Sequence, residues 1–375
     1  MKEREQIIDL WTRMERAGQG AVLATVVNTR GSSYRLPGAR LLLTADGQRA
    51  GSVSGGCLED DLIKKGWWLT ERSPVVRRYD TTPNGEIAAE FGLGCNGIIY
   101  VLLERLRPGE ATVLEVIREV RAKRQPAVIA HVIEPAEAVG QKLIIDTEGR
   151  ARHDLVDSEC ARAIEQEAQL VLAERGSRSV RAGGLEAFIE TIAPAVRLLI
   201  FGAGDDAVPM ASLAKQLGWH VSVFDGRAHY ARREKFSAAD EVLVRPAGQS
   251  GAAIDPWTVA ILMSHSYQQD LDTLCELSAR PPRYLGILGP RKRTTQLIAD
   301  AGLDPTTLAA LHSPMGLDIG ADGPEQVALA ALAEIQAILN GREGGLLRER
   351  AGSIHAREDD SATAAELWVR SIACA

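Results

Sequence analysis

Cys57 is the residue of this sequence whose type and surroundings most favour chemistry. Gly55 and Gly56 precede it, and three acidic residues suited to the first turn of a helix follow Leu58. The pattern predicts a short strand that turns at the glycines into a helix opening at Cys57. Unpaired N–H groups and the macrodipole at a helix N-terminus favour thiolate over thiol, although the nearby acids oppose this effect. We therefore predict a reactive or metal-binding thiol, the alternative being a small apolar residue buried under the turn.

Two further loops strengthen the functional reading of Cys57. A second glycine-flanked cysteine, Cys95, lies within residues 92–97. Another loop follows the apolar run 21–27 and ends in a return strand at 39–44. It offers backbone N–H, hydroxyl and guanidinium groups that could hold a phosphate, on Gly31, Ser32, Ser33 and Arg35. The alternative for this loop is a solvated hairpin connection.

The elements around these loops predict an N-terminal α+β domain with a mixed sheet, ending at Pro194. Apolar and β-branched runs predict strands, and apolar residues at helical spacing predict helices at 7–16, 111–123 and 158–174. The strands are expected at 21–27, 39–44, 75–80, 97–104, 127–133, 142–145 and 188–192. We expect the loops after Val27, Val53 and Tyr79, and the loop before Ile98, to gather at a common end of the sheet.

Residues 195–340 differ in pattern from the first half of the chain. Their pattern predicts a Rossmann-like, doubly wound parallel sheet. A predicted buried strand at 196–201 is followed by a loop with Gly202 and Gly204 and then by a helix. The next predicted strand ends at Asp225. The acid that takes a ribose hydroxyl is expected roughly 20 residues after the first glycine, close to the position of Asp225. Nucleotide binding is a separate question from the fold, because Asp205 puts negative charge where a pyrophosphate would sit.

Other loops of this half should face the same crevice, since ligands of open α/β sheets bind outside the carboxyl ends of the strands. His265 follows one predicted strand, and the basic run Arg291, Lys292 and Arg293 follows another. The alternatives are an ordinary hydrogen-bonded loop histidine and a solvated helix start. The sequence offers His265 no evident partner for proton transfer. Residues 341–375 predict a mobile tail, with a short helix at 363–372.

The amino-acid composition and net charge argue against several classes of function. The chain has 375 residues, 45% hydrophobic and 25% charged, which is typical of a two-domain globular protein. Its net charge of -7 argues against non-specific binding to nucleic acid or anionic membranes. No apolar run approaches a membrane span of roughly 20 residues and no signal peptide is evident, so we expect a cytoplasmic protein. The five cysteines include no C-x-x-C pair, and we treat Cys160, Cys275 and Cys374 as incidental.

Six motifs, taken in order, resemble the XdhC/CoxI family of accessory proteins that mature xanthine and carbon monoxide dehydrogenases. They are Gly31–Arg35 with Pro37–Arg40, Ser54–Glu59, Gly92–Gly97, the Gly202 loop, Gly286–Gly289 with its basic helix start, and Gly316–Ala321. The resemblance therefore covers both halves. One departure is Asp205, which stands where many relatives have a histidine.

The resemblance implies a dimeric, cytoplasmic chaperone for the molybdenum cofactor, either molybdopterin or its cytosine dinucleotide form. Such a protein would protect the cofactor during sulfuration and hand it to the large subunit of an apo molybdenum hydroxylase of the xanthine dehydrogenase type, with a cysteine desulfurase as a further partner. Cys57 and Cys95 would handle the cofactor or its sulfur, and Cys57 could contact the molybdenum. The expected cofactor-binding residues are Gly31, Ser32, Ser33, Arg35, Gly55, Gly56, Cys57, Cys95, Gly202, Gly204, Asp225, His265 and Arg291.

Two other function classes stay open. An NAD(P)-dependent oxidoreductase would suit the Rossmann half, but the sequence shows no set of residues for hydride transfer. A sulfurtransferase would use Cys57 together with Cys95. Between these and a non-enzymatic accessory factor, we favour the accessory factor and expect no binding to nucleic acid or membrane.

Overall fold

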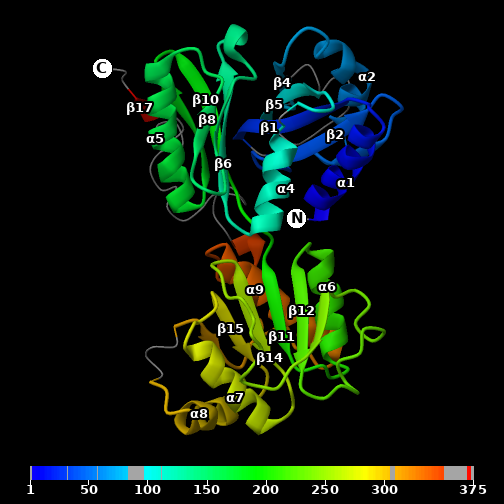
Figure 1. Ribbon diagram of the computed structural model, residues 1–375, viewed down its shortest axis with the longest axis vertical. Coiled ribbons are helices and arrows are strands. Elements are labelled where there is room, and N and C mark those ends of the chain that lie inside the picture. Colours follow the sequence, from blue (N-terminus) through cyan, green and yellow to red (C-terminus); the bar gives the residue numbers. More distant parts are fainter. Residues whose placement is uncertain are drawn as a thin grey trace. The chain divides into compact units, whose positions relative to one another are not determined.

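The structure, a computed structural model, describes residues 2–31, 33–56, 58–82, 97–110, 112–304, 309–349 and 370–372. The chain forms two compact units, which Figure 1 colours along the sequence. One unit comprises Glu3–Pro194 with Ala351–Ala375, and the other comprises Ala195–Arg350 with Met1–Lys2. The following paragraphs treat each unit separately.

The first sheet of the N-terminal unit has five antiparallel strands in the order β3-β2-β1-β5-β4. The strands are β1 (Ala21–Gly31), β2 (Arg40–Thr44), β3 (Arg49–Gly51), β4 (Val75–Asp80) and β5 (Gly97–Leu106). The helices in this part of the chain are α1 (Lys2–Arg16), α2 (Glu59–Leu69) and α4 (Val113–Lys123). On α1 the apolar face predicted from its spacing is buried, including Ile7, Leu10 and Trp11, and this face packs beside α4.

The second sheet of this unit has the order β17-β9-β10-β6-β7-β8, antiparallel except for the β17–β9 pair. Its elements are β6 (Ala127–Glu134), the 3-10 turn η1 (Ala136–Ala138), β7 (Lys142–Ile145), β8 (Ala151–His153), α5 (Ser158–Glu174), β9 (Ser177–Ala182), β10 (Leu185–Ile192) and β17 (Arg370–Ile372). Helix α5 covers one face of the sheet through a buried apolar cluster. The predicted helix at 363–372 is wrong at its end, because residues 370–372 form a strand.

The C-terminal unit confirms the predicted Rossmann-like sheet. Its strands are all parallel, in the order β13-β12-β11-β14-β15-β16. They are β11 (Arg197–Phe201), β12 (His220–Asp225), β13 (Glu241–Val244), β14 (Thr258–Leu262), β15 (Tyr284–Ile287) and β16 (Leu311–His312). The helical elements are α6 (Ala207–Gln216), α7 (Tyr267–Ser278), α8 (Arg291–Asp300), α9 (Pro324–Leu339) and the 3-10 turn η3 (Leu347–Glu349). The strand order reverses between β11 and β14, and this switch point is where such folds bind ligands.

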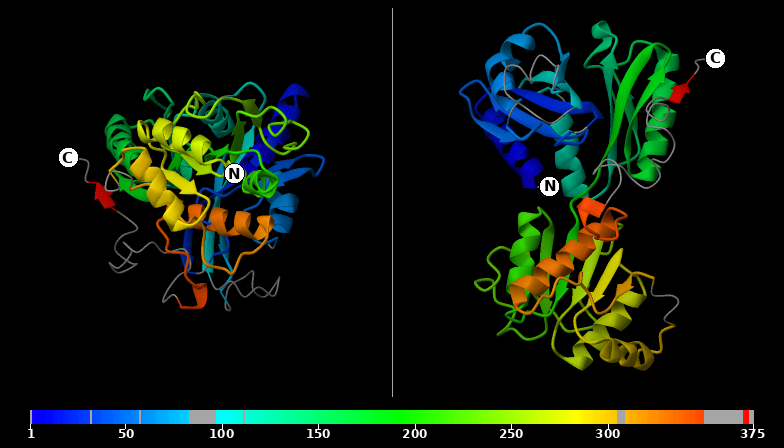
Figure 2. Two further views of the ribbon diagram at one scale, coloured as in Figure 1. Left: turned by 90° about the horizontal axis from the view of Figure 1, so that it is seen from below. Right: turned by 180° about the vertical axis from the view of Figure 1, so that it is seen from behind.

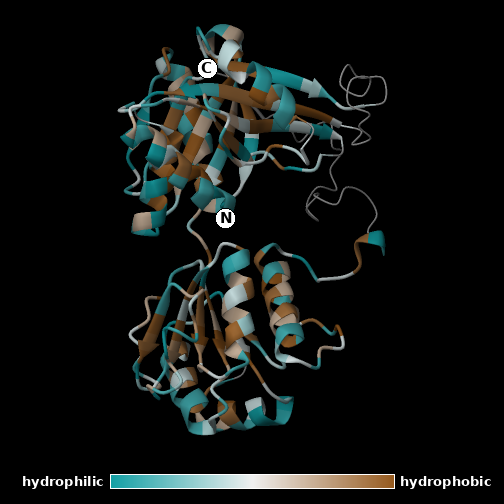
Figure 3. Cartoon of the chain, turned by 90° about the vertical axis from the view of Figure 1, so that its right-hand side faces the viewer, coloured by the Kyte–Doolittle hydropathy of each residue, from teal (hydrophilic) through white to brown (hydrophobic). Residues whose placement is uncertain are grey.

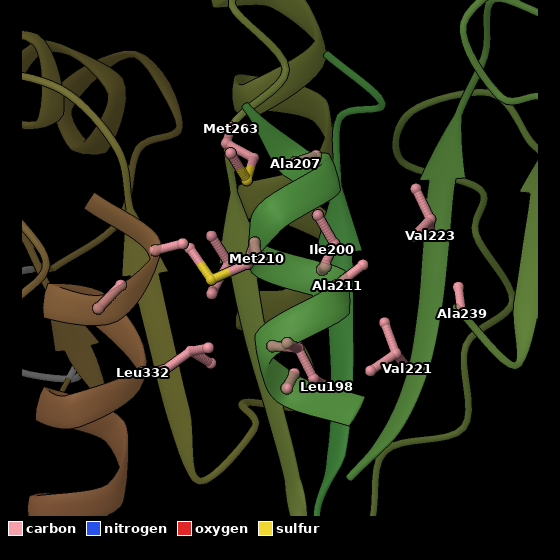
Figure 4. Close-up of a cluster of buried hydrophobic side chains, with 14 of the residues drawn as sticks. Leu198, Ile200, Ala207, Met210, Ala211, Val221, Val223, Ala239, Met263 and Leu332 are labelled. Atoms are coloured by element: carbon pink, nitrogen blue, oxygen red, sulfur yellow. The ribbon is translucent and has the colours of Figure 1, made fainter. Parts of the chain in front are cut away.

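Helices cover both faces of the parallel sheet, as Figures 1 and 2 show from opposite sides. One core cluster joins α6 and α9 to the sheet, with Met210, Ala211 and Leu332 packed on Leu198 and Ile200 (Figure 4). A second cluster joins α7 and α8 to the opposite face. The strands are therefore apolar on both sides, which is visible as brown strands in Figure 3. Because both faces of the sheet are buried, the polar candidate residues lie in the loops that follow the carboxyl ends of its strands.

Candidate functional site

The loops singled out in the N-terminal half leave the same end of the five-stranded sheet. Gly31 at the end of β1 pairs with Gly97 at the start of β5, and Asp80 at the end of β4 pairs with Ile98. The loop after β3 leaves at this end as well. Tyr34 lies beside Gly55, because a Cβ on that glycine would meet the tyrosine ring at 4.0 Å. The hydroxyl-containing loop and the glycine loop before Cys57 are thus neighbours.

Glu59 fixes the backbone around the predicted thiol. Its Oε1 accepts hydrogen bonds from the N–H groups of Val53 at 3.0 Å and Ser54 at 2.9 Å. Its Oε2 accepts from the N–H of Gly56 at 3.1 Å and from the Ser54 hydroxyl. The Ser54 oxygen accepts in turn from the N–H groups of Gly56 at 3.2 Å and Leu58 at 3.1 Å. Burial alone would raise the pKa of Glu59, but these hydrogen bonds outweigh it and lower the pKa, so the side chain is an anion.

This arrangement corrects one expectation about the loop, because helix α2 begins at Glu59 and not at Cys57. The N–H groups of Val53 and Gly56, before the helix, donate to the Glu59 carboxylate. That the helix start favours a thiolate at Cys57 stays a prediction. Cys57 itself lies outside the described residues, as do Ser32 and Cys95. What the described part of the loop offers is room, since a Cβ on Gly56 would have no atom within 4 Å.

The arginines of the neighbouring loop are engaged within the unit. Arg35 forms an ion pair with Glu3 of α1, with Nη1 donating to Oε1 at 3.0 Å. The hydroxyl of Ser33 donates to the Arg35 carbonyl at 2.7 Å, which closes a tight turn. Tyr34 remains 67% exposed at the tip of this turn. Phosphate binding by Arg35 would therefore require it to leave Glu3.

The side chain of Arg40, from the Pro37–Arg40 motif, has a structural role. It forms a buried ion pair with Glu190 of β10, and its Nη1 also donates to the Gly38 carbonyl at 3.0 Å. A Cβ on Gly38 would lie 2.9 Å from Oε2 of Glu190, so the glycine makes room for the carboxylate. The side chains of the pair join the two sheets of the unit. The motif is thus explained without a ligand.

A wide cleft of 960 Å³ lies in the same unit, lined by residues that include Trp68, Arg78, Tyr100 and Glu134. It is large enough for a ligand of cofactor size. Trp68 is at the C-terminal end of α2, whereas Cys57 precedes the N-terminal end of that helix. The cleft and the glycine loop are therefore distinct places on the N-terminal unit.

The glycine loop of the C-terminal unit adopts the expected close approach between strands. Gly202 has φ 120°, and a Cβ there would lie 2.4 Å from the backbone oxygen of Met263 after β14. At Gly204 a Cβ would meet Asp206 Oδ1 at 2.4 Å and the His265 ring at 3.5 Å. A side chain at Gly202 would push apart the two strands that flank the switch point.

His265 has a partner that the sequence did not indicate. Its Nε2 lies 2.7 Å from Oδ2 of Asp206, the residue before α6. The histidine has φ 56°, a conformation that side chains other than glycine seldom adopt. It is 64% exposed, so the pair lies at the surface of the carboxyl edge. The contact links the glycine loop after β11 to the loop after β14.

In the basic run at the start of α8, the side chain that forms an ion pair is that of Arg293. Arg293 donates from Nη2 to Oδ2 of Asp270 at 2.8 Å, and the Ser264 hydroxyl donates to Oδ1 of the same carboxylate at 2.6 Å. Arg291 begins α8 and is exposed at the same edge. Asp270 is buried and lies one helical turn beyond the His265 loop, a spacing of four residues after Ser266 that could have pointed to it.

Asp225 lies at the end of β12 as the spacing predicts, but its carboxylate is occupied. It accepts hydrogen bonds from the N–H of Ala203 and from Arg227, two residues further along the chain. Burial alone would raise the pKa of Asp225, but Arg227 and the N–H of Ala203 together outweigh it and lower the pKa. Sequence reasoning missed Arg227, although its position two residues after the strand-ending acid was a usable signal.

The described residues contain no group of three or more His, Cys, Asp or Glu side chains arranged to hold a metal ion. Among them no helix is both long enough and apolar enough to cross a membrane. In the described chain Cys160 is buried and Cys275 is exposed, and neither forms a disulfide. Any metal contact through Cys57 stays a prediction.

Comparisons with known proteins agree with this division into halves. Residues 14–80 match the family model described as "XdhC and CoxI family", and residues 198–335 match that of the "XdhC Rossmann domain". The first range contains the loops around Tyr34 and Cys57. The second contains the glycine loop, Asp225 and His265.

Three relatives match most of the chain. A Bacillus subtilis protein named as a probable xanthine dehydrogenase subunit is 32% identical over 318 residues, which are 84% of this chain and 92% of that protein. "Molybdenum cofactor insertion chaperone PaoD" of Escherichia coli is 27% identical over 86% of this chain and 84% of its own. A crystal structure described as a xanthine dehydrogenase from Bacillus halodurans has a TM-score of 0.74 and 28% identity, covering 90% of this chain and 97% of that one. With both halves matched, the chain belongs to the XdhC and CoxI family.

Proposed function

We propose that this protein is a chaperone that binds the molybdenum cofactor, protects it during sulfuration and inserts it into an apo molybdenum hydroxylase of the xanthine dehydrogenase type. The observation that carries the proposal is the match to the Escherichia coli relative, named a molybdenum cofactor insertion chaperone, over more than four-fifths of both chains. The Bacillus subtilis relative, whose name places it with xanthine dehydrogenase, supports the class of client enzyme. The cofactor would be molybdopterin or its cytosine dinucleotide form.

The residues around Cys57 fit a bulky ligand that is gripped by sulfur. A thiolate is a preferred ligand for soft metal centres, and the space beside Gly56 leaves room for one. Ser54 and Glu59 fix the backbone on both sides of position 57, through Gly56 and Leu58. Fixed neighbours would limit the conformations open to the thiol before the ligand arrives, which would lower the entropic cost of binding. Cys95 would serve as the second sulfur-handling thiol.

The same geometry argues against the Cys57 loop as the phosphate site. The N–H groups of Val53, Ser54 and Gly56 already donate to Glu59, and a phosphate would meet that anion at close range. We assign the phosphate of the cofactor instead to the neighbouring turn, where Arg35 supplies a guanidinium group and Ser33 a hydroxyl that would have to leave the Arg35 carbonyl. Arg35 would exchange its ion pair with Glu3 for the ligand. Such an exchange of partners suits a cofactor that must later be released.

The remaining parts of the proposal follow from the family resemblance. The partners are the large subunit of the molybdenum hydroxylase and a cysteine desulfurase that supplies sulfur. The protein acts in the cytoplasm as a homodimer. NAD(P) is a candidate ligand of the Rossmann half only, and that half is treated separately below.

The decisive experiment is purification from cells that make the cofactor, followed by pterin detection and by reconstitution of an apo hydroxylase. We expect pterin to copurify with the wild type and with Cys275→Ser, a matched change at an exposed thiol. Cys57→Ser should fold normally and lose most retention or delivery, because a hydroxyl is a poor ligand for a soft metal.

Two outcomes would contradict this proposal. Equal reconstitution by Cys57→Ser and wild type would remove the thiol from the mechanism. A persulfide detected on Cys57 in protein that carries no pterin would favour a sulfurtransferase.

A further inference from the structure

The carboxylate of Asp225 is not available to a ribose. Its side chain is 0% exposed. Oδ1 accepts from the N–H of Arg227 at 2.9 Å and from its Nε at 2.9 Å, while Oδ2 accepts from its Nη2 at 2.8 Å and from the N–H of Ala203 at 3.0 Å. A ribose hydroxyl would have to displace a charge-assisted pair to reach this group. Asp225 therefore positions Arg227.

Arg227 reaches across the switch point of the sheet. Its Nη2 also donates to the carbonyl of Ser264 after β14, at 3.2 Å. The guanidinium carbon lies 4.3 Å from the centre of the Tyr230 ring, so the ring supports one of its faces. The side chain is 32% exposed, and within the described chain Nη1 has no hydrogen-bond partner. One edge of a rigidly held guanidinium is thus left for a ligand.

Lys235 adds a second cation beside Tyr230. Its Nζ lies 5.6 Å from the centre of the Tyr230 ring and donates to the Ala203 carbonyl at 2.7 Å. It also pairs with Asp205 at 2.8 Å, whose side chain is fully exposed and can turn away into solvent. The ring and both cations therefore lie close to the glycine loop.

The cavity beside Asp225 is too small for a sugar. It is lined by residues that include Gly202, Asp225 and Ser264 and measures only 20 Å³. That volume holds about one water molecule and is far below the several hundred Å³ of a typical ligand pocket. A nucleotide would therefore lie outside this cavity, where Arg227 offers it the free Nη1.

We propose that Arg227, Tyr230 and Lys235 form a recognition site for a nucleotide that carries a phosphate monoester on its ribose. A planar guanidinium with a free N–H edge pairs well with a phosphate, and an arginine beside the strand-ending acid is the usual means of accommodating a ribose 2′-phosphate. A free ribose hydroxyl would find no acceptor at Asp225. This site lies in the C-terminal unit and does not depend on the cofactor chemistry proposed for the N-terminal unit.

Calorimetry on the full-length protein with NADP and NAD tests the proposal. We expect NADP to bind at least tenfold more tightly than NAD. Arg227→Gln should remove this preference, and Lys235→Gln should reduce it. Arg280→Gln, a change at an exposed arginine after α7 and at the opposite edge of the sheet, should leave the preference intact.

The proposal is overturned if NADP does not bind, if NADP and NAD bind equally, or if Arg227→Gln keeps the full preference. Circular dichroism checks that each variant folds. Should Arg227→Gln fail to fold, Asp225→Asn supplies the second test, because it weakens the anchor of Arg227 without removing the guanidinium. The preference should then fall, and an unchanged preference would count against the site. Cofactor delivery is unaffected by either result and can be measured independently.

Discussion

Glu59 shows how one side chain can decide what its neighbours are able to bind. Three acids at the start of a helix suggest a favourable interaction with the helix dipole, and that interpretation makes Cys57 the first helical residue. In the structure Glu59 instead turns back and accepts the N–H groups that a glycine-rich turn leaves free. The sequence singled out the loop around Cys57 as a candidate site. It could not show which of the three acids would occupy the amides, because that depends on the path of the turn.

The role of Glu59 is open to a direct test. Glu59→Ala leaves the buried N–H groups of Val53 and Ser54 without an acceptor, and we expect a loss of about 1–3 kcal/mol in the free energy of unfolding. Amide hydrogen exchange in residues 53–58 should accelerate. Asp60→Ala, at an exposed acid of the same turn, should change neither quantity by much. Equal effects of the two substitutions would show that charge near the helix start matters and the fold-back does not.

At the scale of elements, the two sheets of the N-terminal unit are joined by a buried charge pair. Arg40 at the start of β2 meets Glu190 in β10, and both side chains are almost fully buried. His131 of β6 lies 3.4 Å from the same carboxylate. A motif of proline, glycine and arginine near a loop is easily taken for a ligand site, and only the long-range partner 150 residues away reveals its packing role.

The Arg40–Glu190 pair predicts a defined response to acid. Burial alone would raise the pKa of Glu190, but Arg40, His131 and Arg4 together outweigh it and lower the pKa to about 2, from an ordinary value of 4.5. Folding therefore favours the ionised form. The stabilisation is complete above the ordinary pKa and is lost as the pH falls from about 4.5 to about 2.

Glu190→Gln should accordingly be less stable than wild type at pH 7, and the difference should shrink as the pH falls through this window. Hydrogen exchange in β6 and β10 at several pH values measures the effect within this unit. Glu134→Gln, at an exposed acid at the end of β6, is the matched control. A difference between Glu190→Gln and wild type that stays constant between pH 5 and pH 2 would show that the pair does not control acid stability.

Strand β9 shows why one element escaped prediction. Residues 177–182 follow directly on α5 and pair with β10 through a tight turn at Gly183 and Gly184. The run contains two serines and two arginines and looks like a helix ending, although its alternation of polar and apolar residues is that of a half-buried strand. The buried strands β1, β5, β11 and β14 were predicted because their apolar runs leave little alternative.

For the whole molecule, the sequence predicted the parallel fold of the C-terminal half from one glycine loop and a strand-ending acid. They also predicted that this acid takes a ribose hydroxyl, which stays a prediction, and the fold pairs its carboxylate with Arg227. Local patterns determine which strands form and where loops emerge. They do not determine which side chains pair across an edge, as His265 and Asp206 also show. Candidate ligand residues at such an edge therefore need the partners that only the folded chain supplies.

The His265–Asp206 pair raises the question of catalysis, and we predict that the purified protein turns over no substrate on its own. A dehydrogenase needs a general acid or base held beside the nicotinamide carbon. His265 is oriented by a carboxylate, but it is 64% exposed, and a site open to water is poorly suited to hydride transfer. Assays of NAD(P)H consumption with purines, aldehydes and hydroxy acids should give no steady rate above background.

Steady NAD(P)H consumption would contradict this prediction, provided that the variant Gly204→Val is measured as a control. Valine at position 204 would force Asp206 away, because even a Cβ there lies 2.4 Å from its Oδ1 and 3.5 Å from the His265 ring. Steady NAD(P)H consumption that is proportional to protein concentration and abolished in Gly204→Val would establish an oxidoreductase at the carboxyl edge of the parallel sheet. Consumption that survives Gly204→Val would point to a contaminating enzyme, because the substitution displaces the Asp206 partner of His265.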